Sequence, residues 1–210
     1  PDLRTGAVYG TGKREENLRG YFAAISAMDE QIGRLLDAVE EQGLADNTVI
    51  LFTADNGMSM GQHGVWGKGN GTFPMNMYDS AVKVPFLISW PGHIPANTVC
   101  SEMISACDLL PTILKLTGLS DKQPTGLPGR SFTELLKGEQ REHRDEVVIF
   151  DEYGPVRMIR TKEWKYVHRY PYGKHELYHL VDDPGEEKNL YGLPEYKKLV
   201  TQLKGRMEKW

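Results

Sequence analysis

The chain has 210 residues, of which 40% are hydrophobic and 26% are charged, an ordinary composition for a globular protein. Its formal net charge of −4 gives no sign of nucleic-acid binding, so we expect no nucleic-acid partner. No apolar run approaches the roughly 20 residues that a membrane span requires. An anionic ligand must therefore be held by local positive groups or by a metal ion, because the overall charge would repel it.

The chain begins with Pro-Asp-Leu-Arg and shows neither an initiator Met nor a secretory signal. We expect either that a signal and a pro-region were removed or that a larger protein was truncated. The two cysteines, Cys100 and Cys107, lack the spacing of a zinc site. They are interpreted as two buried thiols, with one local disulfide as the alternative in an oxidising compartment.

The first half of the chain combines one long helix with strongly apolar segments. Residues 1–14 have no periodicity and are predicted to form a loop. Residues 15–42 carry apolar side chains at steps of three and four, which predicts an amphipathic helix ending at Gly43. We expect its apolar stripe to lie in the core. The stripe consists of Leu18, Tyr21, Phe22, Ile25, Met28, Ile32, Leu35, Leu36 and Val39.

Two continuous apolar runs follow, over residues 48–53 and 84–90. Such runs are typical of strands buried on both faces, as in the parallel sheets of α/β proteins. A second helix is predicted over residues 105–117, with Gly118 after its end. Helix, strand, long loop, strand and helix together describe half of a doubly wound α/β domain.

The last third of the chain has a different pattern. Residues 119–144 are polar and rich in Pro and Gly, and a final amphipathic helix is predicted over residues 194–210. Between them, short alternating segments separated by turns predict a small antiparallel sheet. We therefore predict an α/β portion over residues 1–118, a linker over 119–144 and a sheet-and-helix subdomain over 145–210. The alternating segments are 147–150, 156–160, 164–168 and 176–180.

Asp55 and Asn56 follow the most apolar strand directly. Ligands of open α/β sheets bind just outside the carboxyl ends of the strands. A carboxylate and an amide oxygen are hard donors that suit Ca²⁺ or Mg²⁺, although two ligands do not complete a site. The alternative is a hairpin turn, which Asn56-Gly57 often signals, but residues 58–64 do not have the pattern of a partner strand.

A glycine-rich loop over residues 57–72 contains His63 and Lys68. Glycine allows the backbone to approach a ligand closely. An ammonium and an imidazole near a divalent cation would form a clamp for a tetrahedral oxyanion. The alternative is that both are solvated polar residues of an exposed loop.

An ordered series of motifs runs along the chain, and in this order the motifs closely resemble those of the sulfatase family. The resemblance covers nearly the whole chain from about Leu18, and it is specific because of the order, since each motif alone is weak. The motifs are Thr53-Ala54-Asp55-Asn56-Gly57, Gly61-Gln62-His63-Gly64, Gly67-Lys68, Met77-Tyr78-Asp79, Lys83-Val84-Pro85, Trp90-Pro91-Gly92, Asp108-Leu109-Leu110-Pro111-Thr112, Trp164-Lys165-Tyr166, Glu176-Leu177-Tyr178 and Asp183-Pro184-Gly185-Glu186.

The resemblance implies an alkaline-phosphatase-like α/β sandwich with a C-terminal antiparallel subdomain, and the hydrolysis of sulfate esters. Asp55 and Asn56 match two ligands of the family's divalent cation, usually Ca²⁺. Lys68 matches the lysine that holds the sulfate and can assist the leaving oxygen. His63 matches a histidine of the same loop with a less fixed role. Asp79 departs from the family's usual Glu, at a position that we interpret as structural.

The family's nucleophile is a formylglycine made from the residue that opens a Cys/Ser-x-Pro-x-Arg motif. Neither Cys100 nor Cys107 opens such a motif, and no Ser does. The resemblance therefore implies that the nucleophile and the remaining metal ligands lie upstream, and that this chain alone is inactive. In the intact enzyme it implies attack by the aldehyde hydrate on sulfur, charge neutralisation by the cation and Lys68, departure of the protonated alcohol, and collapse of a sulfo-enzyme intermediate.

Two other functions remain open. A phosphodiester or phosphonate hydrolase of the same superfamily is the first, although such relatives usually have His where this chain has Asn56. A non-catalytic sulfatase-like module is the second. Exposed apolar surface left by truncation predicts self-association, and family habit predicts an exported or lysosome-like location.

A polar loop near residue 172 allows two interpretations, a wall of the substrate pocket or a solvated hairpin tip. It contains Tyr170, Tyr172, Lys174 and His175.

Overall fold

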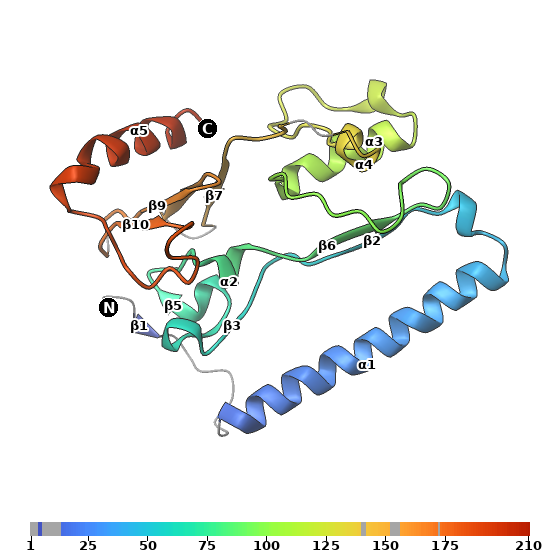
Figure 1. Cartoon of the computed structure of the whole chain (residues 1–210), viewed down its shortest axis with the longest axis horizontal. Helices are drawn as coiled ribbons and strands as arrows, with labels where there is room; N and C mark the ends of the chain where they lie inside the picture. The colour runs from blue at the N-terminus through green and yellow to red at the C-terminus, as the bar shows by residue number, and fades with distance from the viewer. Residues whose placement is uncertain (1–3, 6–13, 140–141, 152–155, 172) are drawn as a thin grey trace. The chain divides into compact units, whose positions relative to one another are not determined.

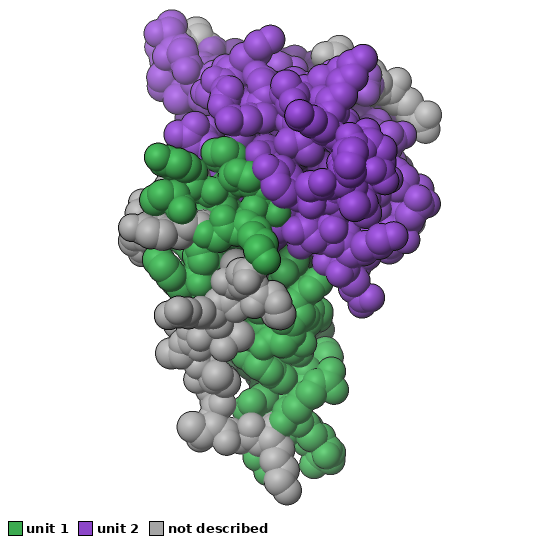
Figure 2. Space-filling model, turned by 90° about the vertical axis from the view of Figure 1, so that its left-hand side faces the viewer, with its two compact units in different colours: residues 1–90, 151–156, 168–175 green, residues 91–150, 157–167, 176–210 purple. Residues whose placement is uncertain are grey.

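The computed structural model describes residues 4–5, 14–139, 142–151, 156–171 and 173–210. The chain forms two compact units (Figure 2). The first comprises residues 1–90, 151–156 and 168–175, and the second comprises residues 91–150, 157–167 and 176–210. The domain boundaries predicted at residues 118 and 144 stay predictions. Most of the loop predicted over residues 1–14 lies outside the described residues. Within the described ranges, no helix has the length and apolarity needed to cross a membrane.

The long helix α1 spans Arg14–Glu41, which confirms the helix predicted from the apolar periodicity. Gly43 follows with φ +66°, a conformation in which glycine ends a helix without strain. The expectation that the apolar stripe lies in the core is wrong for this chain. None of the 28 residues of α1 is buried, and the side chain of Leu35 is 67% exposed. Periodicity identifies an apolar face, but burial requires a surface to pack against, and the described residues supply none for this face.

Strand β2 (Ile50–Thr53) pairs with β6 (Phe86–Ser89) in a two-stranded sheet (Figure 1), so both predicted strands are confirmed. The two strands pair antiparallel, with Ile50 opposite Ser89 and Thr53 opposite Phe86, although such apolar runs are typical of parallel sheets. The predicted burial on both faces is wrong, since Leu87 is 65% exposed. Each strand has one partner strand in the described part of the chain. The apolar side chains of the pair are therefore partly exposed there, although their composition is typical of a buried sheet.

Short elements fill the rest of the first unit. Residues 58–64 do not pair with β2, as expected, but two of them form a short strand that pairs with β4. Strand β5 pairs with β1. The strands are β1 (Arg4–Thr5), β3 (Ser59–Met60), β4 (Trp66–Gly67) and β5 (Thr72–Phe73), the helix is α2 (Asp79–Val82), and 3-10 turns span Ala45–Asn47, Gln62–Gly64 and Gly69–Gly71.

The predicted antiparallel sheet lies at the C-terminal end of the chain and is confirmed. Its strand order is β10-β9-β8-β7, so each strand pairs with its neighbour in sequence. A 3-10 turn at Pro194–Tyr196 leads into α5 (Lys197–Met207), within the predicted last helix. The strands are β7 (Val147–Phe150), β8 (Arg157–Arg160), β9 (Trp164–His168) and β10 (Glu176–His179).

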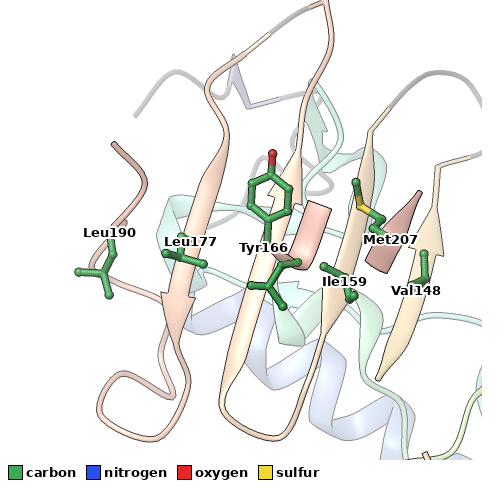
Figure 3. Close-up of a cluster of buried hydrophobic side chains, with 7 residues drawn as sticks. Val148, Ile159, Tyr166, Leu177, Leu190 and Met207 are labelled. Atoms are coloured by element: carbon green, nitrogen blue, oxygen red, sulfur yellow. The ribbon is translucent and has the colours of Figure 1, made fainter. Parts of the chain in front are cut away.

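The hydrophobic core of the second unit lies between this sheet and α5. Figure 3 shows four of its side chains in a row across the four strands, namely Val148, Ile159, Tyr166 and Leu177. Cross-strand register explains the row, because Val148 lies opposite Ile159, and Tyr166 lies opposite Leu177. The cluster consists of Val148, Ile159, Tyr166, Leu177, Leu190, Leu203 and Met207.

The helix predicted over residues 105–117 is confirmed as a 3-10 turn at Ala106–Asp108 followed by α3 (Leu109–Leu116). A 3-10 turn at Ser120–Lys122 and the short helix α4 (Thr133–Leu136) follow. Both cysteines are free thiols. Cys107 is half-buried, but Cys100 is exposed, so the expected burial is wrong for Cys100 because its segment forms an irregular surface loop.

Asp108 is the polar centre of the second unit, and its side chain is fully buried. Its carboxylate accepts hydrogen bonds from the guanidinium of Arg144 and from the backbone N–H groups of Arg130 and Ser105. Nε2 of His143 lies 3.3 Å from the same carboxylate. Burial alone would raise the pKa of Asp108, but these hydrogen bonds outweigh it and hold the pKa below its ordinary value.

We predict that Asp108→Asn lowers the free energy of unfolding by about 3–5 kcal/mol at neutral pH, because Arg144 would stay buried without its counter-ion. The depressed pKa makes this contribution complete above the unfolded-state value of 3.8 and lost as pH falls through the lower folded-state pKa. Urea unfolding of both proteins, measured from about pH 7 down to about pH 2, should therefore show the difference shrinking in acid.

The exposed Asp182, whose side chain is 82% accessible beside His179, provides the matched control. Asp182→Asn should change the free energy of unfolding by less than about 1 kcal/mol. A difference between wild type and Asp108→Asn that does not depend on pH would contradict the assignment.

Candidate functional site

The turn after β2 presents oxygen donors at the carboxyl end of the strand. Asp55 is exposed, and its Oδ1 accepts a hydrogen bond from the backbone N–H of Asn56 at 2.8 Å. Nδ2 of Asn56 donates to the carbonyl of Gly57 at 2.9 Å, which leaves Oδ1 as the free acceptor of that amide. This donor set fits a hard cation. It would be part of a site, because the described residues include no group of three or more His, Cys, Asp and Glu side chains that could hold a metal.

Helix α2 holds this turn in place. The backbone N–H of Gly57 donates to the carbonyl of Ala81 at 2.9 Å, and the Oγ atoms of Ser59 and Ser80 lie 2.7 Å apart. The approach is so close that a Cβ at position 57 would lie 2.2 Å from the carbonyl oxygen of Ser80. Glycine is therefore required at position 57 by space rather than by φ.

His63 lies in the glycine-rich loop of residues 57–72, where its backbone takes the left-handed conformation with φ +54°. Its imidazole stacks on the ring of Tyr78, with centroids 3.7 Å apart and planes within 3° of parallel. The side chain stays exposed despite this contact. Stacking therefore fixes the plane of the imidazole while leaving it accessible.

Lys68 lies in the same glycine-rich loop and is exposed. The described residues form no hydrogen bond or ion pair with its ammonium group. Its backbone is well held, because the carbonyl of Lys68 accepts hydrogen bonds from the backbone N–H of Gly71 at 2.8 Å and from Nδ2 of Asn76 at 3.2 Å.

One stretch of chain, residues 75–82, contacts all three of these segments, and we name it the anchor segment. Asn76 bonds the Lys68 loop, Tyr78 stacks on His63, and Ala81 accepts from Gly57. Within the described residues, no hydrogen bond or ion pair links Asp55 or Asn56 directly to His63 or Lys68. The predicted site residues are thus brought to one unit by a shared support rather than by contacts with each other.

The loop over residues 168–175 also contacts the anchor segment. Arg169 is buried, and its guanidinium donates to the carbonyl of Met75. Tyr170 and Lys174 are exposed, and the ring of His175 stacks on that of His168, with centroids 4.5 Å apart. Tyr172 lies outside the described residues. The pocket wall and the hairpin tip stay predictions for this loop.

Sequence reasoning missed Asn76, Tyr78 and Arg169 as supports of the site. The motif Met77-Tyr78-Asp79 does not reveal the ring contact of Tyr78, and Asn76 belongs to none of the motifs. The available signal for Asn76 was a polar amide between Met75 and Met77 in an otherwise apolar stretch.

Comparison with known proteins decides the family. Residues 61–210 match the family model described as N-sulphoglucosamine sulphohydrolase, C-terminal. An ulvan-active sulfatase of Formosa agariphila is 32% identical over 207 residues, which cover 94% of this chain and 39% of that relative. The chain belongs to the sulfatase family. It corresponds to the C-terminal portion of the family's proteins and spans about two fifths of the length of the curated relatives that it matches.

Solved structures confirm the fold of this sulfatase portion. A protein solved in complex with its substrate, D-glucosamine-2-N,6-O-disulfate, matches with a TM-score of 0.83 and 30% identity, over 93% of this chain and 40% of that one. A phosphonate monoester hydrolase of Agrobacterium radiobacter matches with a TM-score of 0.76 and 27% identity, over 90% of this chain and 40% of that one. The predicted alkaline-phosphatase-like class, with a small C-terminal antiparallel sheet, is therefore confirmed.

We predict that Gly57→Ala lowers the free energy of unfolding by about 1–3 kcal/mol, because the added Cβ cannot fit beside Ser80 without moving α2 or the turn. Urea unfolding measures the loss, and hydrogen exchange should show faster exchange of the amide at position 57, which donates to Ala81 in the wild type.

Gly33→Ala in α1 is the matched control, since a Cβ there meets nothing within 4 Å. It should leave stability unchanged or raise it by up to about 1 kcal/mol, because alanine favours the helix. Equal effects of the two substitutions would contradict the role given to the close contact at Gly57.

Proposed function

We propose that the whole protein to which this chain belongs is a sulfuric ester hydrolase acting on a sulfated carbohydrate or a small sulfate ester. The observation that carries the proposal is that one anchor segment holds an oxygen-donor turn, a lysine loop and a histidine loop in a chain of the sulfatase family. The sugar class is supported by the neighbour whose substrate is a disulfated glucosamine.

Each residue has a proposed task that follows from its chemistry. Asp55 and Asn56 are proposed to hold a divalent cation, most simply Ca²⁺ with Mg²⁺ as the alternative, together with ligands from outside this chain. A bound cation would neutralise charge on the sulfate oxygens. Lys68 has an exposed and unengaged ammonium group, which is proposed to bind the sulfate and to assist the leaving oxygen.

His63 is the least constrained of the proposed residues. Its stacking on Tyr78 keeps the imidazole in one plane and accessible, which suits a hydrogen bond to the ester.

The nucleophile is proposed to be a formylglycine upstream of this chain, because neither Cys100 nor Cys107 opens the required motif. Location in an exported or lysosome-like compartment is a further part of the proposal.

A second candidate function is phosphonate monoester hydrolysis, which the structural similarity to the Agrobacterium radiobacter enzyme favours. Both reactions place a tetrahedral anion against a cation and a lysine, so Asp55 and Lys68 suit either, whereas Asn56 favours the sulfatase. A non-catalytic sulfatase-like module is the third candidate. It requires that the sequence upstream also lack a Cys/Ser-x-Pro-x-Arg motif, which the upstream reading frame tests directly.

We predict that the whole protein, supplied with Ca²⁺, hydrolyses 4-nitrophenyl sulfate faster than a 4-nitrophenyl phosphonate ester. Lys68→Ala should lower kcat/KM by about 10²–10³-fold, because a charge that stabilises the transition state is removed. Lys209→Ala, an exposed lysine in the second unit, is the control and should leave the rate unchanged.

The same assay on the isolated 210-residue chain should show no turnover, even with added Ca²⁺. Faster phosphonate turnover by the whole protein would replace the sulfatase proposal with the second candidate. Turnover by the chain alone would refute the proposed upstream nucleophile.

We also propose that the isolated chain self-associates through α1, with a second copy of α1 as the partner. The apolar stripe of this helix faces solvent, with Met28 45% and Leu35 67% exposed two turns apart. Analytical ultracentrifugation should find dimers or larger species, and Met28→Lys combined with Leu35→Lys should raise the monomer fraction. Ala23→Lys with Ala27→Lys adds the same two charges to the opposite face and should not do so. A strictly monomeric wild-type chain would contradict this proposal.

A further inference from the structure

Asn76 is an almost fully buried amide in the middle of the candidate site, with 1% of its surface exposed. Its Nδ2 lies 3.2 Å from the carbonyl oxygen of Lys68, 3.1 Å from that of Gly69 and 3.5 Å from Oγ1 of Thr72. Its backbone N–H donates to the carbonyl of Gly69 at 3.0 Å. One residue therefore binds two consecutive carbonyls of the lysine loop, with both its side chain and its main chain.

The other half of the same amide has no such partner. Oδ1 of Asn76 is buried, and no described residue donates a hydrogen bond to it. Turning the amide over would place Oδ1 against the carbonyl oxygens of Lys68 and Gly69, so the observed orientation is the one that their positions require. An unpaired buried oxygen is unfavourable, and an apolar side chain would avoid it. The donor contacts to the lysine loop are what account for an amide at this position.

The contacts of Asn76 with the lysine loop affect which positions the ammonium of Lys68 can reach. Lys68 has an extended backbone, with φ −85° and ψ −162°, and its carbonyl accepts from both Gly71 and Asn76. No described residue forms a hydrogen bond or ion pair with the ammonium, so the backbone is the part of Lys68 that its hydrogen-bond partners hold. A lysine side chain has several freely rotating bonds, which let the ammonium sample a wide volume. A fixed Cα–Cβ direction narrows that volume.

We propose that Asn76 is a positioning residue for Lys68, holding the loop backbone so that the ammonium reaches the leaving oxygen of the ester. The inference deepens the proposed function and rests on it for the role of Lys68. Asn76 itself touches no reacting atom in this scheme. It acts through the carbonyls of Lys68 and Gly69.

The first experiment measures the hold on the loop without using activity. In the whole protein, hydrogen exchange of the Gly71 amide, which donates to the carbonyl of Lys68, is compared between wild type and Asn76→Asp. The aspartate has the shape of the amide but lacks the Nδ2 donors, so exchange should be about tenfold faster. Asn70→Asp, at an exposed position of the same loop, should leave the rate unchanged. Unchanged exchange in Asn76→Asp would overturn the proposal.

The second experiment separates positioning from general destabilisation. A nitrophenolate leaves without a proton, whereas an alkoxide needs one, so a misplaced Lys68 should harm an alkyl sulfate more than 4-nitrophenyl sulfate. Asn76→Asp should lower kcat/KM about tenfold more for the alkyl ester than for the aryl ester, and it should add little further loss in the Lys68→Ala background. Equal losses on both esters, with additive effects in the double variant, would show a merely structural role.

Asn76→Ser keeps one donor in a smaller side chain and serves if the aspartate variant does not fold. It should give an intermediate exchange rate and an intermediate difference between the two esters, whereas wild-type behaviour on both would overturn the proposal. If the wild type hydrolyses neither sulfate ester, the proposed function fails. The exchange measurement still decides whether Asn76 holds the Lys68 backbone.

Discussion

The hydrogen bonds and ring contacts of residues 75–82 are the constraint on which the candidate site depends. The loops that carry Asp55, His63 and Lys68 are rich in glycine and contain only two-residue strands and single 3-10 turns. Such segments have little regular structure to hold them, and a chemical site needs its groups fixed to within a fraction of an ångström. The anchor segment fixes these loops through specific contacts, namely the hydrogen bonds of Asn76 and Ala81 and the ring contact of Tyr78.

The anchor segment uses a different type of contact for each loop. The type depends on which group of the loop is to stay available for a ligand. Gly57 approaches α2 through its bare backbone, which leaves the side chains of Asp55 and Asn56 free for a ligand. His63 is held through its ring face, so both ring nitrogens stay at the edge. Lys68 is held through its carbonyl alone, because its ammonium is the group to be offered. In each case the support uses the part of the residue that the chemistry does not need.

The second unit is stabilised differently, by a compact core and by buried ion pairs. The carboxylate of Asp108 joins the start of α3 to Arg130 and Arg144, residues that lie 22 and 36 positions away along the chain. A second buried pair, Lys165 with Glu186, has its charged atoms 2.6 Å apart and ties β9 to the turn after β10. Breaking a buried pair costs several kcal/mol even where forming it contributes little, so loss of one partner of either pair would destabilise the second unit.

The elements of this fold were predictable from sequence, whereas their partners were not. Periods of 3.6 and 2 residues gave α1 and the strands of the C-terminal sheet, since these depend on neighbours in sequence. The direction of β6 relative to β2 could not be predicted, because a continuous apolar run has the same composition in a parallel or an antiparallel pair. The role of Asn76 could not be predicted for a related reason. Its side chain bonds the backbone carbonyls of Lys68 and Gly69, and every residue has such a carbonyl, so the sequence does not mark the partners.

The proposal of a larger enzyme explains both the exposed apolar faces of the first unit and its incomplete set of cation ligands. The apolar stripe of α1 is exposed, and the outer face of the β2–β6 pair leaves Leu87 exposed, although both have the composition of buried surfaces. The turn at Asp55 and Asn56 likewise offers oxygen donors of the right chemistry but too few of them. The apolar faces lack a packing partner, and the cation site lacks ligands, so both are incomplete in this chain. In the proposed larger enzyme, additional chain would both cover these apolar faces and supply the remaining ligands of the cation.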